Sequence, residues 1–436
     1  MAKNRNAAYL AYDLAWYLAG LVVLPVALLW ALFSPRGRRS FLPRLGWVNV
    51  GKERQGGLLL HGVSVGEVTA LKPLVTALRQ RHPDLPLLIS STTPSGQETA
   101  RRLFPDLTVV FFPLDLPFAT KTFLRRARPI AVVLAELEIW PNFLRATNRL
   151  DIPVGIVNGR ITTESLAGYR RVQRLLPQFD RIALYGVQNQ VYADRFAALG
   201  VPHQRIRITG NLKFENLPDP HCGPKPEWVC WLGGKSVLTL ASTHADEEIQ
   251  FCKAIINDSA FDQTVVVVVP RHPRRAPSLL TQLKAVVGSR PLLLRSQLQP
   301  DSALADGSIL IVDSFGELED IYRCSAAVFV GGSLVPHGGQ NVLEPAALAK
   351  PVVIGPHFRN FPDEVALLSA AGGLRSSSDL TTLLGYLRDW LLNPHAAEEA
   401  GNAGRASLKE GQGASDCTIR FLEEAKILPS PIPSPK

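Results

Sequence analysis

Short apolar runs alternate with longer amphipathic stretches along most of the chain. Residues 85–90 and 129–134 are mostly apolar, whereas residues 68–80 and 97–104 place apolar side chains at helical spacing. Runs of this length predict strands buried on both faces, and the stretches between them predict helices. Alternating strands and helices predict parallel sheets, so the expected fold class is α/β. The first series of predicted strands comprises residues 57–61, 85–90, 107–112, 129–134, 152–157 and 181–185.

A segment with four prolines, residues 211–228, interrupts this alternation. We expect a doubly wound, Rossmann-like domain on each side of it, with the two domains facing a cleft. A second series of predicted strands comprises residues 237–241, 264–270, 308–312, 326–331 and 351–355. The predicted divisions are an N-terminal segment at 1–45, a first domain at 46–215, a linker at 216–228, a second domain at 229–425 and a flexible Pro/Ser-rich tail at 426–436.

The N-terminal segment predicts contact with a membrane. Residues 14–33 form a run of 20 residues without a charge, about the length of a helix that crosses a hydrocarbon core. The four arginines within residues 36–44 outnumber the two basic residues before the run, which predicts that the following chain stays in the cytoplasm. Asp13 and Pro25 weaken a spanning helix, so a helix lying in the membrane interface is the alternative.

Charge is divided unevenly along the chain. The first 218 residues carry 28 Lys+Arg against 14 Asp+Glu, a net charge of +14, and the rest carry 19 against 24, a net charge of −5, which together give +9. A basic half predicts an anionic partner, such as nucleic acid, a membrane surface or a phosphorylated substrate. The basic half adjoins the apolar run and lacks basic runs interleaved with aromatic residues, so nucleic acid is disfavoured as its partner. Five cysteines without C-x-x-C spacing indicate reduced thiols in a cytosol.

Carboxylates follow two of the predicted strands in the first half. Ser64 and Glu67 have the spacing of a helix capping box. The other role open to Glu67 is that of a base that accepts a proton from an incoming hydroxyl. Glu136 and Glu138 follow the fourth predicted strand, and strand alternation would point both to the same side if that strand continued. One member of this pair is expected to be structural, because adjacent buried carboxylates are costly.

Cationic and amide donors mark the linker and the second half. Lys213 is either solvated or directed at developing negative charge. Arg271 and His272 offer donors suited to phosphate oxygens. Near residue 338 a Gly-Gly pair permits close backbone approach before a predicted helix start, where Glu344 is placed to accept from ribose hydroxyls. Several such loops at strand ends of one sheet predict a nucleotide site.

The chain carries a series of motifs in this order: HGVSVGE (61–67), ELEIWPN (136–142), NGRITTES (158–165), GNLKF (210–214), ASTHADEE (241–248), PRHPRR (270–275), SFGEL (314–318) and VGGSLVPHGGQNVLEPAA (330–347). Together these motifs resemble a known family, the 3-deoxy-D-manno-octulosonic acid (Kdo) transferases of bacterial lipopolysaccharide synthesis. The resemblance implies a GT-B glycosyltransferase fold with an N-terminal membrane anchor. It also implies CMP-Kdo as donor, and the phosphorylated lipid A precursor (lipid IVA) as acceptor at the cytoplasmic face of the inner membrane.

The resemblance assigns roles to individual residues. Glu67 would be the general base, uncapped and accessible, while Glu136 (or its neighbour Glu138) and Lys213 would support the transition state. Gln340 stands where family members commonly have histidine, a departure that could alter contacts to the donor phosphate. Val342, which stands where proline is usual, also falls among the implied CMP contacts, which are Pro270, Arg271, Phe315, Gly316, Glu317, Asn341, Val342, Leu343 and Glu344.

The reaction that the resemblance implies is a direct displacement with inversion. Glu67 would deprotonate the acceptor hydroxyl, whose oxygen attacks the anomeric carbon of Kdo, while Arg271 and residues 341–344 neutralise the departing CMP phosphate. The sequence has no Asp-x-Asp motif, and we expect neither a metal nor a cofactor besides the donor substrate. Two alternatives stay open: another GT-B enzyme with a nucleotide-sugar donor, and a non-catalytic module that binds membrane lipid.

Overall fold

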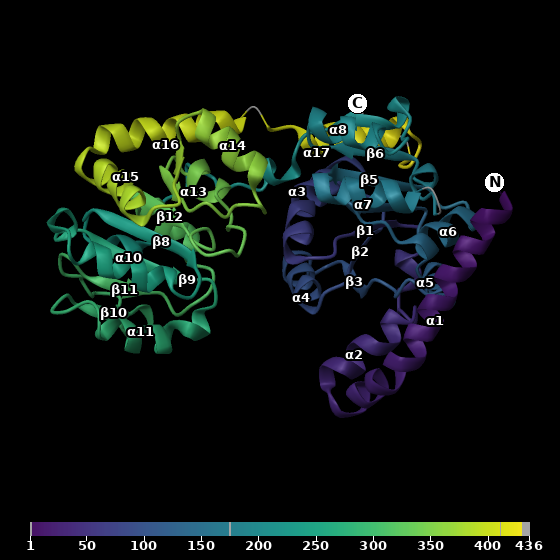
Figure 1. The fold of residues 1–436 in the computed structure, drawn as a ribbon, viewed down its shortest axis with the longest axis horizontal. Coiled ribbons are helices and arrows are strands. Elements are labelled where there is room, and N and C mark those ends of the chain that lie inside the picture. Colours follow the sequence, from purple (N-terminus) through teal and green to yellow (C-terminus); the bar gives the residue numbers. More distant parts are fainter. Residues whose placement is uncertain (1, 174–175, 410, 430–436) are drawn as a thin grey trace. The chain divides into compact units, whose positions relative to one another are not determined.

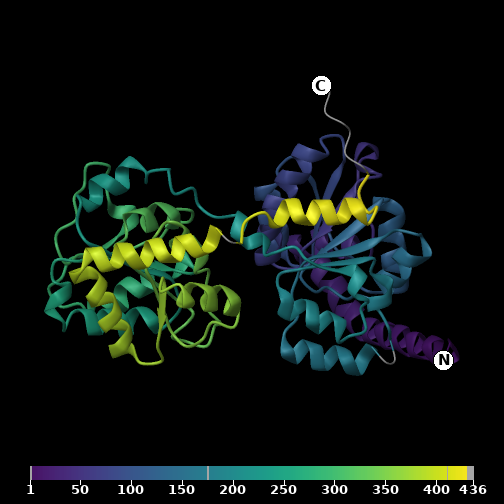
Figure 2. The same cartoon turned by 90° about the horizontal axis from the view of Figure 1, so that it is seen from above.

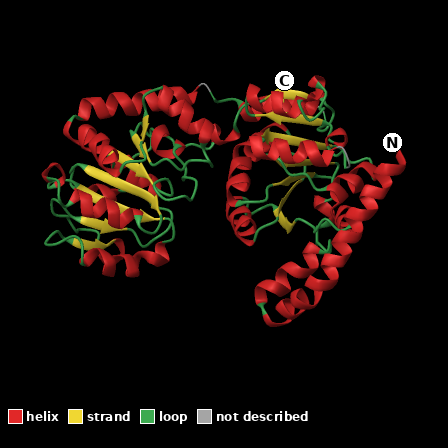
Figure 3. Cartoon of the chain, viewed as in Figure 1, coloured by secondary structure: helices red, strands yellow, loops and turns green. Residues whose placement is uncertain are grey.

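The structure is a computed structural model that describes residues 2–173, 176–409 and 411–429 (Figure 1). Its contacts divide the chain into two compact units, the first made of Met1–Asn216 and Gly411–Lys436 and the second of Leu217–Glu410. Each unit contains one parallel sheet, and helices cover both faces of that sheet (Figure 3). The predicted α/β class with two parallel-sheet domains is therefore confirmed.

The sheet of the first unit has seven parallel strands in the order β3-β2-β1-β4-β5-β6-β7. Strand order reverses between β1 and β4, and the loops that leave the carboxyl ends of these neighbours meet at a topological switch point. The pattern predicts six of the seven strands, whereas β7 alternates apolar and basic residues and has no continuous apolar run. The strands are β1 (Leu58–His61), β2 (Leu87–Ser91), β3 (Thr108–Phe111), β4 (Ala131–Ala135), β5 (Val154–Gly159), β6 (Leu184–Val187) and β7 (Ile206–Ile208).

Helices pack on both faces of this sheet. Alternate strand residues enter separate core clusters, with Leu59 and Val132 on one face and Leu60 and Val133 on the other, as the two-residue period of a strand requires. The helices are α1 (Ala2–Phe33), α2 (Pro35–Arg44), α3 (Val65–Arg81), α4 (Pro94–Leu103), α5 (Pro117–Ala127), α6 (Pro141–Arg149), α7 (Thr163–Gln173), α8 (Gln190–Ala197) and α17 (Ala414–Glu424).

The second unit repeats this architecture with the strand order β10-β11-β9-β8-β12-β13-β14. Its strands are β8 (Val237–Thr243), β9 (Val265–Pro270), β10 (Leu292–Leu294), β11 (Ile309–Ile311), β12 (Ala327–Val330), β13 (Val352–Ile354) and β14 (Leu374–Ser376). The three-residue edge strands β10 and β14 are missing from the predicted series. The helices are α9 (Pro226–Leu232), α10 (Glu247–Ile255), α11 (Ala276–Lys284), α12 (Leu318–Cys324), α13 (Leu343–Ala347), α14 (Pro362–Ala370), α15 (Leu380–Leu392) and α16 (Pro394–Lys409).

The chain returns to the first unit after α16, so the predicted second domain, 229–425, ends too late. Figure 2 shows α17 in yellow lying on the unit that carries β1–β7. Arg81 Nε lies 2.7 Å from Glu423 Oε1, and Ile427 and Leu428 are buried in the same core as α3. The predicted flexible tail is therefore wrong for these two residues, because their apolar side chains complete the core; residues 430–436 lie outside the described residues.

The N-terminal helix α1 docks on the first unit through its first half. Tyr9 is buried beneath the guanidinium of Arg145, whose carbon lies 4.9 Å from the ring centroid, and Arg145 Nη2 pairs with Asp13 Oδ2 at 2.7 Å. Among the described helices, none alone is long and apolar enough to cross a membrane; the parts Ala7–Val23 and Pro25–Phe33 meet the length and composition test together, with a bend of 49° between them.

Candidate active site

Glu67 lies in the first turn of α3, at the edge where β1 ends. Ser64 caps this helix by accepting from the Glu67 amide at 3.4 Å. The Glu67 carboxylate accepts in turn from the Val63 amide at 2.7 Å and from the Ser64 hydroxyl at 2.9 Å. The expectation of an uncapped base is therefore wrong, because the carboxylate takes part in the cap. A carboxylate has about four lone-pair sites, so this partly exposed group keeps capacity for a substrate hydroxyl.

Glu136 and Glu138 follow β4, the strand beside β1. The strand ends at Ala135, and Glu136 adopts a left-handed backbone with φ of 59°, a conformation that costs a residue with a side chain about 1–3 kcal/mol. Strand alternation therefore does not continue, and the two carboxylates find different partners. Glu136 Oε1 lies 3.5 Å from the Nζ atom of Lys213, whereas Glu138 accepts from the indole nitrogen of Trp140 at 2.9 Å.

Lys213 is positioned by the short 3-10 helix η4 (Leu212–Glu215). The side chain of Asn211 caps this turn by accepting from the Lys213 amide at 3.0 Å. Asn158, at the end of β5, accepts from the Leu212 amide at 3.0 Å. These bonds fix the ammonium beside Glu136, so the structure brings together the three residues assigned to catalysis by resemblance.

The carboxylates of this edge influence one another. Burial and then the charge of Glu136 raise the pKa of Glu67, while the hydrogen bonds from Val63 and Ser64 lower it. Burial and then the charge of Glu67 raise the pKa of Glu138 to about 8. Glu138 is therefore protonated at neutral pH, whereas Glu136 forms the ion pair with Lys213. The raised pKa of Glu67 suits this carboxylate to accept a proton from a hydroxyl.

Two buried groups that sequence reasoning missed support this edge. His61 ends β1, stacks on Phe112 with ring centroids 3.9 Å apart, and places Nδ1 2.9 Å from the Ser90 hydroxyl. Burial lowers the pKa of His61 to about 3, so the ring is neutral. His61 belongs to the HGVSVGE motif, but no spacing rule identifies a buried imidazole of this kind.

The second missed group, Asp115, supports the start of α6. Its carboxylate accepts from the amides of Asn142 and Phe143 at 2.9 and 2.8 Å and from the Tyr12 hydroxyl at 2.9 Å. Asp115 therefore satisfies two amides at the N-terminus of α6, the helix that follows the Glu136–Glu138 loop, and joins that helix to α1. Asp115 lies far from α6 in the sequence, so its contact with the start of that helix becomes visible only in the tertiary fold.

In the second unit, a single carboxylate joins the loops that follow β8 and β12. Glu247 is fully buried and accepts from the amides of His244, Gly332, Ser333 and Leu334 at 2.7–3.1 Å. These loops carry the motifs assigned to the donor by resemblance. The sequence places Glu247 in one of them without indicating this role.

Three histidines from the loops of this unit lie close together. The rings of His244 and His337 stack with centroids 4.1 Å apart, and His272 lies 6.4 Å from His244. Burial, followed by the charges of His337 and His272, lowers the pKa of His244 to about 4. Gln340 Nε2 lies 3.3 Å from His244 Nε2, so the residue expected to depart from the family pattern contacts this cluster.

The predicted CMP-contacting residues fall into two groups. Arg271 is exposed directly after β9. Burial raises the pKa of Glu344, while the hydrogen bond from Asn341 and, to a smaller extent, the charge of Arg271 lower it. Phe315 presents an aromatic ring that is 78% exposed, beside Gly316 with φ of 83°. These groups can contact a ligand, and an exposed ring offers a face on which a base can stack.

The side chains of the other predicted CMP contacts are buried or bonded to other groups of the protein. Val342 and Leu343 are buried, so their side chains are not accessible to a ligand. Pro270 is a buried residue of β9. Glu317 accepts from the indole of Trp228 at 3.1 Å and from Arg295 Nε at 2.9 Å.

The Glu344 carboxylate and the helix start beside it both differ from expectation. Glu344 accepts from Asn341 Nδ2 at 3.0 Å. The predicted helix start there belongs to α13, which has only five residues, so its dipole contributes little to phosphate binding.

In residues 2–173, 176–409 and 411–429, no group of three or more His, Cys, Asp or Glu is arranged to hold a metal ion.

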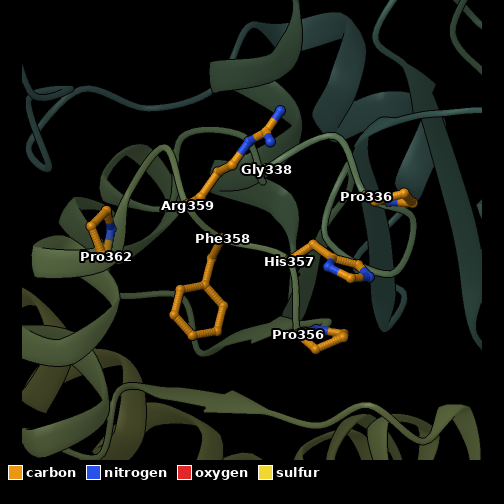
Figure 4. A pocket seen from close by; sticks show the side chains of 7 residues that line it. All are labelled: Pro336, Gly338, Pro356, His357, Phe358, Arg359 and Pro362. Atoms are coloured by element: carbon orange, nitrogen blue, oxygen red, sulfur yellow. The ribbon is translucent and has the colours of Figure 1, made fainter. Parts of the chain in front are cut away.

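A pocket of about 320 Å³ lies between the loops that follow β12 and β13 (Figure 4). Its lining is mostly apolar but includes an imidazole and a guanidinium. The residues that line it are Pro336, Gly338, Pro356, His357, Phe358, Arg359 and Pro362.

Comparison with known proteins gives concordant results. A family model described as 3-deoxy-D-manno-octulosonic-acid transferase (kdotransferase) matches residues 39–216. The 3-deoxy-D-manno-octulosonic acid transferase of Haemophilus influenzae is 31% identical over 399 residues, covering 89% of this chain and 92% of the relative. The enzyme of the same name from Bordetella pertussis is 31% identical over 415 residues, covering 91% of this chain and 92% of that relative.

A solved structure extends the comparison to the fold. The UDP-GlcNAc 2-epimerase of Neisseria meningitidis has a TM-score of 0.59 at 13% identity and covers 84% of this chain and 100% of its own. At that identity the likeness shows only the GT-B-like fold. The relatives at 31% identity match along nearly their whole length, so this chain belongs to the 3-deoxy-D-manno-octulosonic acid transferase family of glycosyltransferases.

Proposed function

We propose that this glycosyltransferase transfers Kdo from CMP-Kdo to the phosphorylated lipid A precursor, lipid IVA, with inversion at the anomeric carbon. The observation that carries the proposal is the position of Glu67, a carboxylate of raised pKa beside the Glu136–Lys213 ion pair. Family membership supports Kdo as the transferred sugar.

The proposed reaction begins with proton transfer to Glu67 from an acceptor hydroxyl. The oxygen forms a bond to the anomeric carbon of Kdo while the bond from that carbon to the CMP phosphate breaks. The Lys213 ammonium stabilises developing negative charge. Exposed Arg271 is the group that neutralises the phosphate of departing CMP.

We further propose that the enzyme works at the cytoplasmic face of the inner membrane, attached through α1 and α2. Exposed apolar side chains on α1, such as Val22 and Phe33, support this placement. Arg38 and Arg39 on α2 are exposed as well, and each basic residue near an anionic surface contributes about 1 kcal/mol of attraction.

A transfer assay tests the function. Purified protein is incubated with tetraacylated disaccharide bisphosphate and either CMP-Kdo or a UDP-sugar, and the product mass is measured. The expected product gains one or more Kdo masses with CMP-Kdo alone. Product from the UDP-sugar alone would contradict the proposed donor.

Variants of Glu67 test the mechanism within the same assay. Glu67→Gln is expected to lower kcat by about 10²–10⁴-fold, the contribution typical of a general base, with an unchanged melting temperature. Glu98→Gln, on the exposed face of α4, is the matched control and should keep full activity. Equal activity of the Glu67→Gln variant and the wild type would contradict the role of base, and a catalytically inert wild type would favour a lipid-binding module.

A further inference from the structure

The pocket between the β12 and β13 loops is built from two loops that are fastened together. The amide of His357 donates to the Ser333 carbonyl at 2.9 Å, and the amide of Asn360 donates to the Gly338 carbonyl at 3.0 Å. The side-chain nitrogen of Asn360 donates to the Gly339 carbonyl at 3.2 Å. Hydrogen bonds between the loops therefore hold the walls in shape, a property of preformed ligand sites.

Glycine at position 338 allows this close approach. Its φ is 87°, and a Cβ atom there would lie 2.9 Å from Arg359 Cγ and 2.8 Å from Asn360 Nδ2. The aliphatic part of Arg359 therefore lies across the glycine backbone. Figure 4 shows Arg359 and Phe358 extending from their loop in opposite directions, with Arg359 on the side of Gly338.

The lining combines apolar walls with two groups that bind anions. Pro336, Pro356 and Phe358 present C–H and ring surfaces, while His357 and the guanidinium of Arg359 supply N–H donors. Apolar walls of this kind pack against the C–H faces of a sugar ring. The planar fork of a guanidinium matches a carboxylate through two parallel hydrogen bonds. The volume of about 320 Å³ lies within the range of small-molecule sites.

The pocket adjoins the residues assigned to CMP. Gly338 precedes Gln340, which contacts His244, and Asn341, which donates to Glu344. The charge of Arg271 reaches Glu344. A nucleotide phosphate held by Arg271 would thus lie on the same sheet edge as the pocket.

We propose that this pocket binds the sugar-acid part of the donor, with Arg359 pairing with its carboxylate and His357 contacting the same anion. This inference rests on the proposed function, because the carboxylate is that of the Kdo group in CMP-Kdo. It makes Arg359 the residue that distinguishes an acidic donor sugar from a neutral one.

A binding comparison tests the proposal without requiring turnover. Dissociation constants of CMP-Kdo and of CMP are measured, with no acceptor present, for the wild type, Arg359→Gln and Arg359→Lys. A lost charge-assisted pair is expected to weaken CMP-Kdo binding by about 10-fold or more in Arg359→Gln, while CMP affinity stays within about twofold. Arg359→Lys should recover part of the loss, because it keeps the charge but not the fork.

The control is Arg388→Gln, which removes an exposed guanidinium from α15 in the same unit and should leave both affinities unchanged. Wild-type affinity for CMP-Kdo in Arg359→Gln, or equal weakening of CMP and CMP-Kdo, would overturn the assignment. These outcomes are separate from failure of the proposed function, which would appear as wild-type protein that transfers no Kdo to the lipid acceptor.

Discussion

The carboxylates near β1 and β4 show how far single residues can be read from sequence. The S-x-x-E spacing predicts that Ser64 and Glu67 form a cap, and resemblance gives Glu67 a catalytic role; the geometry of the cap is present and leaves the carboxylate partly exposed. Glu136 has a left-handed backbone directly after β4, and its partner Lys213 comes from a distant segment. No local pattern encodes these features, and because β4 ends at Ala135 the condition for strand alternation between Glu136 and Glu138 is not met.

Glu138 gives a prediction about pH. Its pKa is about 8 in the folded protein and near 4.3 in an unfolded chain, so the folded state holds a proton that the unfolded state loses. Its contribution to stability is fully present below about pH 4 and is lost as pH rises through 8. We expect the urea midpoint of the wild type to fall more steeply between pH 6 and 9 than that of Glu138→Gln.

The comparison between these two proteins isolates Glu138, since other titrating groups are common to both. Glu98→Gln, an exposed change on α4, should follow the wild-type curve. Parallel curves for Glu138→Gln and the wild type would show that Glu138 is already ionised at neutral pH.

Helices and strands follow from the sequence more reliably than their ends. Long apolar runs such as 129–134 and 264–270 predict β4 and β9 because buried parallel strands need such runs. The edge strand β10 consists of three half-buried leucines, and an apolar run of that length is too short for the pattern to identify as a strand. The return of α17 to the first unit depends on which core its apolar face fits, and a linear pattern carries no such information.

The start of α6 gives a prediction about stability. Asp115 accepts from two amides of that helix and from Tyr12, so Asp115→Ala leaves buried donors without a partner. Each such donor costs about 1–3 kcal/mol, and we expect a loss of about 3 kcal/mol in the free energy of unfolding, measured by urea denaturation.

Asp115→Asn retains one acceptor oxygen and should lose about half as much. Asp84→Ala, an exposed aspartate before β2, is the control and should stay within about 0.5 kcal/mol of the wild type. A similarly small change in Asp115→Ala would mean that water replaces the carboxylate at the helix start.

The proposed attachment to a membrane concerns the protein as a whole, and the two parts of α1 have different surroundings. The first part docks on the fold through Tyr9 and Asp13. The second part exposes apolar side chains, including Val22 at 76% and Phe33 at 83%. Such a surface is suited to a lipid interface.

Vesicle binding tests this division. We expect the double variant Val22→Glu, Phe33→Glu to bind vesicles of anionic phospholipid at least about 10-fold more weakly than the wild type, because burying each apolar side chain contributes about 1.5–3 kcal/mol. Leu392→Glu, an equally exposed apolar position on α15, should bind as the wild type does. Unchanged sedimentation of the double variant with vesicles would place the membrane contact elsewhere.

The return of α17 has a consequence for exchanging parts between enzymes. Since residues 411–429 belong to the first unit, the second unit is an insertion whose two junctions lie near Leu217 and Gly411. A fragment cut after Asn216 would lack α17 and expose apolar side chains of α3, including Leu78. Residues 217–409 can instead be exchanged as one cassette with a related transferase, which would move the proposed donor site while the hydrophobic interior of the recipient's first unit stays intact.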